Sequence, residues 1–352
     1  MNETINLLNA PTAAQRLKNL RSIISAEDKM PEVLSQYANN HIHTIYSFSP
    51  YSPTAAVWAA RAAGLPTAGI MDHDSIAGAE EFREAGKIAG IGTTCGFEMR
   101  VNLFGTPFEG RKINNPDQNS VAYMAFHSVK KEYFSQVQER LAPLREKRNE
   151  RNRKMLLKIK DATGIELDFE KDVLAESQYH DGGSVTERHL LFALAGKMLN
   201  SGGYLERYDL LGKLKAEMTK DIYVPATDEL MSLDEAVAFA GDIDAYLCYA
   251  YLGDVTGAPT GDKKAAKFED CYLDELMAFM KGRGVNLVTY MPSRNTPEQL
   301  DRLMYLCKTH NMGQISGEDI NSPSQSFICK QLADPKFAHL VDKAWELVLR
   351  EQ

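Results

Sequence analysis

Short apolar strands alternate with helices between residues 37 and 103, and this alternation restricts the possible folds more than any other feature. The strand around His41 and His43 precedes an alanine-rich helix at residues 54–63, which Pro53 can open and Gly64 can close. Residues 66–71 then have the composition of a buried strand. Together these segments predict a βαβ unit, in which parallel strands share one sheet and helices cover its faces.

The alternation continues after this unit, is interrupted once, and then resumes. A helix at 77–89 and strands at 93–103 and 121–128 are followed by a long, mainly helical region. The later segments are expected as helices at 233–240, 271–281 and 297–310 and as strands at 245–251, 285–290 and 314–316. We therefore expect an α/β barrel formed by residues 37–128 and 222–352, an N-terminal helical extension at 1–36, and a helical insertion at 129–221.

Composition narrows the class of protein and its partners. The chain has 352 residues, of which 44% are hydrophobic, so it can bury a large core. Its net charge of -8 argues against binding to duplex nucleic acid or to an anionic membrane. Five cysteines without a C-x-x-C pair favour a reducing compartment. Residues 1–10 contain neither a basic region nor a long apolar run, so we do not expect secretion. We expect a cytoplasmic protein without a membrane span; the sequence leaves its oligomeric state open.

His41 and His43 are two residues apart on a predicted strand, so both imidazoles point to the same face. Neutral imidazole is a common ligand of zinc, iron and related ions. Polar residues also stand at the ends of the other predicted strands. These residues are Asp72, His73, Asp74, Glu98, His127, Asp319 and Asn321. The carboxyl ends of parallel barrel strands open on one face, so we expect these groups to converge into a metal site.

Each of these residues also has a simpler explanation when taken alone. Asp72 or Asp74 could cap the following helix, and Glu98 could pair with Arg100 or Lys112. Asp319 and Asn321 could form a turn before a proline. His189, at the start of an apolar helix, could be a cap or a core histidine. The many arginines and lysines between residues 140 and 154 are expected to form a solvated helix face rather than an anion-binding surface.

Four stretches resemble the PHP family, the polymerase and histidinol phosphatase domain of metal-dependent phosphoesterases. They read NNHIHTIYSFSPYSP with AAVWAARAAGLPTAGIMDHDSIAG, then CGFEMRV, then REKRNERNRKMLLKIKDATGIELDFEKDV with GGSVTERHLLFALAGKML, and finally HNMGQISGEDINSP. Together they span most of residues 37–325. The resemblance implies a distorted (β/α)7 TIM-like barrel with up to three metal ions at its strand carboxyl ends. The third stretch resembles the helical insertion of members that act on nucleotides and short oligonucleotides.

The resemblance also suggests roles for individual residues. His41, His43, Glu98 and Asp319 match the ligands of a first metal, Glu98 matches the carboxylate that bridges two metals, and His73 matches a ligand of another metal. Arg188 and His189 match a basic pair on the phosphate side of the site. Other positions depart from the family pattern: Phe48 replaces an acidic ligand, and Tyr251 and Asn321 replace histidines. The strand at 121–126 lacks a histidine near its start, for which His127 could compensate.

The sequence thus predicts metal-dependent hydrolysis of a phosphoester by a metal-activated water. The expected substrate is a small phosphorylated metabolite, a nucleotide or a short oligonucleotide, and the expected cofactor is one to three Zn, Mn or Fe ions. Asp72, His73, Asp74, Glu98, His127, Arg188 and His189 are the candidate catalytic residues, and His41, His43, His73, Glu98, Asp319 and Asn321 the candidate ligands. Loops 102–119 and 252–264 are expected to contact the leaving group.

Two alternatives remain at this point. The barrel could have an incomplete metal centre and serve as a metal-binding or ligand-binding protein with little phosphoesterase activity. A metal-dependent amidohydrolase also uses an H-x-H strand, although the Asp72-His73-Asp74 context and the absence of a clear mid-strand lysine ligand count against it.

Overall fold

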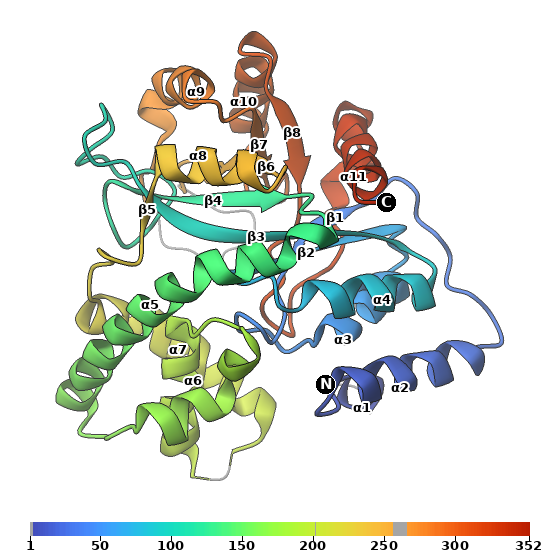
Figure 1. Cartoon of the computed structure of the whole chain (residues 1–352), viewed down its shortest axis with the longest axis vertical. Coiled ribbons are helices and arrows are strands. Elements are labelled where there is room, and N and C mark those ends of the chain that lie inside the picture. Colours follow the sequence, from blue (N-terminus) through green and yellow to red (C-terminus); the bar gives the residue numbers. More distant parts are fainter. Residues whose placement is uncertain (1–2, 201, 256–265) are drawn as a thin grey trace.

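In the computed structural model, which describes residues 3–200, 202–255 and 266–352, a curled sheet forms the centre of the molecule (Figure 1). Along the sheet the strands are β1 (Asn39–Ile42), β2 (Thr67–His73), β3 (Gly92–Asn102), β4 (Val121–His127), β6 (Tyr246–Ala250), β7 (Leu287–Tyr290) and β8 (Gly313–Ser316). The two-residue strand β5 (Met231–Ser232) pairs with β3 outside this path. The predicted α/β class is therefore confirmed, with seven strands in the main path through the described residues.

One strand breaks the parallel pattern. β4 runs antiparallel to both of its neighbours, β3 and β6, whereas the other neighbouring pairs are parallel. The expectation that β4 is parallel is wrong, because residues 103–120 connect it to β3 without a crossover helix, and a parallel connection needs one. The sheet is thus not a regular (β/α) alternation, and the amino end of β4 lies beside the carboxyl ends of the parallel strands.

The segment after β8 joins the two edges of the sheet. Ile320 forms a parallel bridge with Ile42, in which the His43 N–H donates to the Ile320 carbonyl at 3.0 Å. The Ile320 N–H donates in turn to the His41 carbonyl at 3.2 Å. This pairing brings Asp319, almost 280 residues away in sequence, beside the two histidines of the first strand.

Most helices surround the sheet, and the sequence pattern predicts each of those named next except α11. They are α2 (Ala13–Ser25), α3 (Pro53–Ala62), α4 (Ala79–Ala89), α8 (Leu233–Asp242), α9 (Leu273–Gly282), α10 (Pro297–Thr309) and α11 (Ala338–Arg350) (Figure 1). The Thr12 hydroxyl caps α2 by accepting from the Gln15 N–H, and Pro53 is in the first turn of α3. The described helices include none that is long and apolar enough to cross a membrane.

The N-terminal helices pack against the barrel rather than projecting from it. Leu8, the last residue of α1 (Glu3–Leu8), and Leu20 of α2 are fully buried. Arg16 forms a buried ion pair with Glu81 of α4, and Glu81 also accepts a hydrogen bond from the Thr54 hydroxyl at 2.6 Å. Because Thr54 follows the loop after the histidines, this network ties the N-terminal helices to the segment that carries the site.

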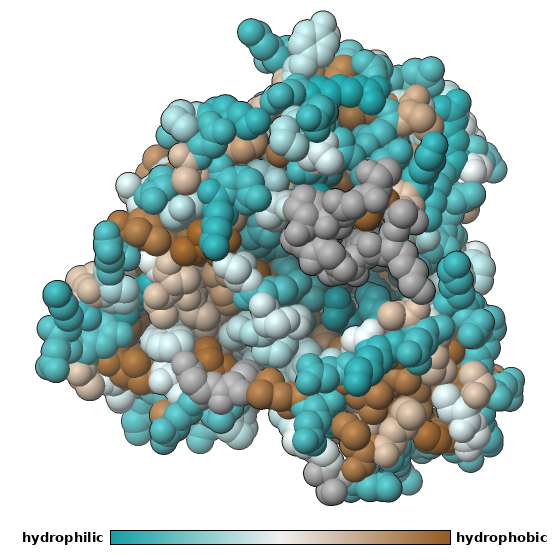
Figure 2. All heavy atoms as spheres, turned by 180° about the vertical axis from the view of Figure 1, so that it is seen from behind, coloured by the Kyte–Doolittle hydropathy of each residue, from teal (hydrophilic) through white to brown (hydrophobic). Residues whose placement is uncertain are grey.

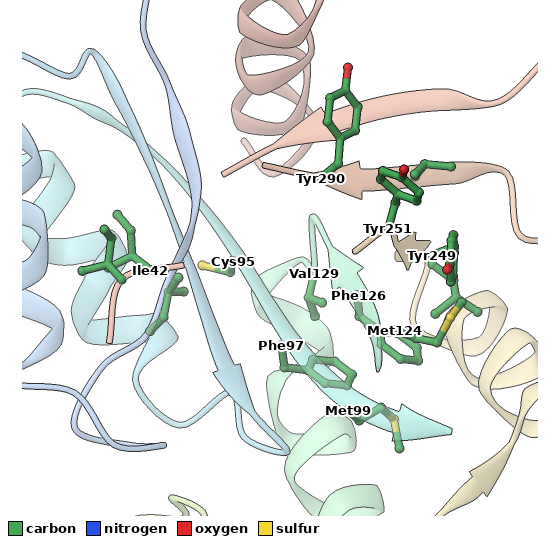
Figure 3. Close-up of a cluster of buried hydrophobic side chains, with 14 of the residues drawn as sticks. Ile42, Cys95, Phe97, Met99, Met124, Phe126, Val129, Tyr249, Tyr251 and Tyr290 are labelled. Atoms are coloured by element: carbon green, nitrogen blue, oxygen red, sulfur yellow. The ribbon is translucent and has the colours of Figure 1, made fainter. Parts of the chain in front are cut away.

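Helices α5 (Phe134–Thr163), α6 (Glu187–Leu199) and α7 (Tyr204–Ile222) lie together on one side of the sheet (Figure 1). They form a second apolar cluster, distinct from the main core. In the main core Phe97 and Phe126 stack with their ring centroids 4.5 Å apart, between the sheet and its helices (Figure 3). One residue of the barrel, Phe48, belongs to the second cluster and so joins the helical region to the loop after β1.

Candidate metal centre and anion-binding pocket

Three imidazoles and two carboxylates meet at the carboxyl ends of the parallel strands. Glu98 Oε1 lies 3.4 Å from His41 Nε2, 3.2 Å from His43 Nε2 and 3.1 Å from His73 Nδ1. Asp319 Oδ1 lies 3.3 Å from His43 Nε2. β2 and β3 pair His73 directly with Glu98, while β1 and the segment after β8 supply the other three residues.

The donor atoms fit a divalent cation. The trio His41, His43 and Asp319 and the trio His43, His73 and Glu98 each place their ligand atoms within 4.8 Å of one another. Nitrogen and carboxylate oxygen donors of this kind suit zinc, iron and manganese. We call these five residues the metal cluster. The simpler reading, in which Glu98 pairs with Arg100, is wrong because the Arg100 guanidinium pairs with Glu229.

Electrostatics within the metal cluster favour charged carboxylates. Burial alone would raise the pKa of Glu98, but the neighbouring histidines outweigh it and hold the pKa well below its usual range. The pKa of Asp319 is lowered in the same way by His43. Burial would lower the pKa of His43, yet its hydrogen bonds to Asp319 and Glu98 raise it to about 10. An ion at this position therefore competes with a proton on His43.

Asp72 orients His43 through one intermediate hydroxyl. Its buried carboxylate accepts hydrogen bonds from the Thr44 N–H at 2.7 Å, the Thr44 hydroxyl at 2.6 Å and the Ser47 hydroxyl at 2.6 Å. Because Ser47 donates its only proton to Asp72, its oxygen accepts from His43 Nδ1, 3.2 Å away. His43 Nε2 is thus left facing the metal cluster. Asp72 does not cap α4, which begins after Gly78 without a side-chain cap.

Asp74 holds an arginine of the insertion. Its carboxylate accepts from Arg148 Nη1, and its backbone carbonyl accepts from Arg145 Nη1 at 3.0 Å. Asp74 has a φ of 48° and donates its N–H to the Glu98 carbonyl, which fixes the turn immediately after His73. Neither Asp72 nor Asp74 faces the pocket described below.

His127 does not reach the metal cluster, and the expectation that it joins the other strand ends is wrong. Because β4 is antiparallel, its amino end approaches the cluster, and Tyr123 lies beside His73 with ring centroids 5.9 Å apart. His127 pairs across the sheet with Tyr246, at the start of β6. Burial, followed by the charge of His41, lowers the pKa of His127 to about 3.

His189 closes the first turn of α6. Its Nδ1 accepts from the Thr186 N–H at 3.0 Å, and burial lowers its pKa to about 3. The capping explanation is thus supported, and the imidazole is not a phosphate-side cation. The edge of the Phe48 ring packs against this imidazole, with centroids 5.0 Å apart. The neighbouring Arg188, in contrast, lines the pocket.

Two residues that depart from the family pattern have different surroundings. Asn321 lines the pocket, and its side-chain amide donates to Asp319 Oδ1 at 2.5 Å. Tyr251 is buried, and its hydroxyl donates to Asp270 at 2.7 Å, away from the metal cluster. Asn321 therefore positions a metal-cluster carboxylate, whereas Tyr251 is part of the packing beside β6.

A pocket opens directly on the metal cluster. His43 and His73 form part of its wall, Phe48 and Tyr123 add aromatic surface, and Asn115 and Asp117 come from the loop expected to contact a leaving group. Five cationic side chains line it: Arg100, Arg148, Arg151, Arg188 and Lys215. Seen from behind, the molecular surface is hollowed near its middle, with mostly hydrophilic residues around the visible part (Figure 2). Of the second expected contact loop, residues 256–264 lie outside the described ranges.

The arginines of α5 correct a prediction from the sequence. Arg145, Arg148 and Arg151 are buried, although the charged stretch is expected to be a solvated face. Their spacing of three residues places them on the side of α5 that faces the barrel. Glu229 accepts from both Arg100 and Arg151, so buried carboxylates compensate part of this charge. The spacing was a signal in the sequence that these arginines share one face of the helix, but it did not show that this face is buried.

Comparisons with known proteins agree with this arrangement. A 5′-3′ exoribonuclease from Haemophilus influenzae is 29% identical over 188 residues, which cover 51% of this chain and 58% of that protein's length. A candidate metal-dependent phosphoesterase from Bifidobacterium adolescentis has a TM-score of 0.63 at 20% identity, covering 90% of this chain and 96% of the other. An amidohydrolase from Chromobacterium violaceum, solved with bound sulfate and no metal, has a TM-score of 0.61 at 17% identity, covering 83% and 89%.

The two solved structures show a shared fold and no more, because their sequence identities are low. The name of the amidohydrolase therefore does not decide between the chemistries considered from the sequence. The family model of the PHP domain matches residues 39–285, a range that contains His41, His43, His73 and Glu98 and the whole helical insertion. The chain therefore belongs to the PHP domain family.

Proposed function

We propose that this protein hydrolyses phosphoester bonds in a metal-dependent reaction. The observation that carries the proposal is the position of the metal cluster, which opens directly on a pocket lined by five cationic side chains. A divalent ion requires nitrogen and carboxylate donors, which the metal cluster provides on one side of the pocket. A phosphoryl group requires cationic partners, which the arginines and Lys215 provide in the rest of the pocket wall. The two requirements are met within one pocket.

His41, His43, Glu98 and Asp319 would hold the ion, with His73 beside them. When bound, such an ion lowers the pKa of a coordinated water and polarises a phosphoryl oxygen. The side chains of Arg148 and Arg188 would bind and orient the phosphoryl oxygens. Asp72, Asp74 and His127 do not line the pocket, so none of them is placed to transfer a proton to the leaving group.

We infer that the substrate is a small phosphorylated metabolite, a nucleotide or a short oligonucleotide. The cationic side chains that line the pocket suit a small anionic ligand. The chain as a whole has a net charge of -8, which does not favour binding to duplex nucleic acid. The similarity to an exoribonuclease favours the nucleotide end of this range. Phe48, Tyr123 and Tyr223 add aromatic surface to the pocket wall, against which a base could stack.

Phosphate release tests the proposal. The protein would be treated with a chelator, reloaded with Mn²⁺ or Zn²⁺, and assayed with p-nitrophenyl phosphate, a mononucleotide and a short single-stranded oligonucleotide. Glu98→Gln should lower the rate by about 100-fold or more, because it weakens the ion's binding and removes a buried charge. Glu80→Gln, an exposed position on α4, is the matched control. Equal rates for Glu98→Gln and wild type would contradict the proposal.

A second candidate function is favoured by two of the departures from the family pattern. Phe48 is buried in the apolar cluster of the insertion, and Asn321 binds a metal-cluster carboxylate through its amide. In this case the protein would bind a metal and a phosphorylated ligand with little turnover. Tight binding of inorganic phosphate to the metal-loaded protein, without phosphate release from any of the three substrates, would favour this function.

A further inference from the structure

We propose that the chain holds a single divalent ion, and that the Arg148 guanidinium supplies the second positive charge at the phosphoryl group. This inference rests on the proposed phosphoester hydrolysis. It specifies that the positive charge around the phosphoryl group comes from one metal ion and from one arginine side chain. It concerns the number of ions and the role of one arginine, neither of which the family membership determines.

The donors of the metal cluster supply four protein ligands to one ion and leave a second ion with at most two, His73 and Glu98, even if the Glu98 carboxylate bridges both. The two trios of possible ligands share His43, and both use its Nε2 atom. His43 Nδ1 is engaged by the Ser47 hydroxyl, so this imidazole offers one lone pair to one ion. If the ion takes His43, the remaining trio is reduced to two donors, either His41 with Asp319 or His73 with Glu98.

The neighbouring side chains do not supply the missing donors. The Asp72 carboxylate is occupied by three hydrogen bonds from Thr44 and Ser47, and that of Asp74 by Arg148. Beside His73 the pocket wall includes Tyr123 and Arg148. Two further carboxylates, Asp117 and Glu187, line the pocket, but among the described residues neither belongs to a group of three or more possible metal ligands. A second divalent ion on this side would face cationic side chains at short range, which is unfavourable in a partly buried site.

Arg148 is held rigidly on this cationic side. The side chain is buried, its Nη1 donates to Asp74, and it lines the same pocket as His43 and His73. Asp74 directly follows His73 in sequence and donates its N–H to the Glu98 carbonyl. The turn after β2 therefore connects His73 and Glu98 to the Asp74 carboxylate, which in turn positions the Arg148 guanidinium.

The guanidinium also keeps hydrogen-bonding capacity for a ligand. The Nε atom of Arg148 is buried without a hydrogen-bond partner among the described residues. Arg100 and Arg151, by contrast, share the Glu229 carboxylate between them. A buried donor without a partner is costly, and a phosphoryl oxygen entering the pocket would satisfy it. A fixed guanidinium also costs little reorganisation when negative charge develops during the reaction.

Ion counting tests the first half of the proposal without reference to activity. The full-length chain would be loaded with excess Mn²⁺, desalted and analysed for manganese and protein. We expect one ion per chain for wild type and for Arg148→Met. Two or three ions per chain would overturn the single-ion inference while leaving phosphoester hydrolysis in place. No bound ion would overturn the inference and also the metal dependence of the proposed function.

Phosphate binding tests the second half. Titration of the Mn²⁺-loaded protein with inorganic phosphate should show an affinity about tenfold or more weaker for Arg148→Met, because charged hydrogen bonds are lost. Arg140→Met, an exposed position on the same helix, should bind phosphate as wild type does. Since Arg148→Met leaves Asp74 unpaired, the double variant Asp74→Asn with Arg148→Met controls for misfolding. Wild-type phosphate affinity in the double variant would overturn the role of Arg148.

Discussion

The Ser47 hydroxyl connects Asp72 to His43 and so orients one ligand of the metal cluster. Replacing it in Ser47→Ala tests this connection directly. This side chain donates to Asp72 at 2.6 Å and accepts from His43 Nδ1 at 3.2 Å, and it is almost fully buried. Removal of the hydroxyl takes one charge-assisted bond from Asp72. It also leaves the buried His43 Nδ1–H without its protein partner.

The expected loss of stability follows from these two contacts. A hydrogen bond to a charged group contributes about 1.5 to 3 kcal/mol, and an unsatisfied buried donor costs about 1 to 3 kcal/mol. Since Asp72 keeps two donors from Thr44 and the site can relax, we expect the ion-free variant to lose about 3 kcal/mol of unfolding free energy. The ion affinity should fall by about 10- to 100-fold, as is typical when a partner that orients a ligand histidine is removed.

Urea unfolding of the ion-free protein and competition for Mn²⁺ or Zn²⁺ with a chromophoric chelator measure the two quantities. Ser49→Ala is a closely matched control, because Ser49 is also buried, stands two residues further on, and accepts only a 3.4 Å bond from the Tyr51 N–H. Its losses should stay within about 1 kcal/mol. If Ser47→Ala matched Ser49→Ala in stability and bound the ion as tightly as wild type, the connection from Asp72 to His43 would be refuted.

Two further predictions concern stability. Burial raises the pKa of Glu351, which accepts from the Cys95 N–H, to about 7 from an ordinary value of 4.5, so the folded state holds this proton more tightly. Glu351 therefore contributes most to the free energy of unfolding below pH 4.5, and this contribution is lost as the pH rises through 7. Over this range the free energy of unfolding of wild type should fall by about 3 kcal/mol relative to that of Glu351→Gln. An equal dependence of the free energy of unfolding on pH in the two proteins, measured by urea unfolding, would contradict this. Phe48→Asp, which places an acidic residue at a departure from the family pattern, should cost about 3 kcal/mol or more, because Phe48 packs against His189 and Phe192. Thermal unfolding would measure this loss, and a variant that gained a bound ion without losing stability would contradict the expectation.

Much of the site follows from local patterns that a single sequence displays. The two-residue spacing places His41 and His43 on the same face of a strand whatever surrounds them. His73 and Glu98 stand near the ends of apolar runs whose period and flanking helices predict parallel strands. The sequence therefore indicated the five residues that meet at the carboxyl ends, but it did not separate them from Asp72, Asp74 and His127, which do not join the metal cluster.

The direction of β4 was decided only by tertiary pairing. A strand has the same periodicity in either direction, so the pattern at 121–128 could not show that His127 is at the end of β4 further from the metal cluster and that Tyr123 is at the nearer end. The decisive feature is the connection from β3, which contains no crossover helix.

The sequence by itself determined the α/β class, most of the helices and strands, and a set of candidate site residues that includes the five of the metal cluster, because these follow from short-range periodicity, from polar residues at strand ends and from the resemblance to the PHP family. Tertiary structure decided which face of α5 is buried. Arg148 lies inward because Asp74, more than 70 residues earlier, compensates its charge. Burial of an arginine is favourable only where a carboxylate or another acceptor is in place to compensate its charge. The position of that acceptor depends on the folded chain.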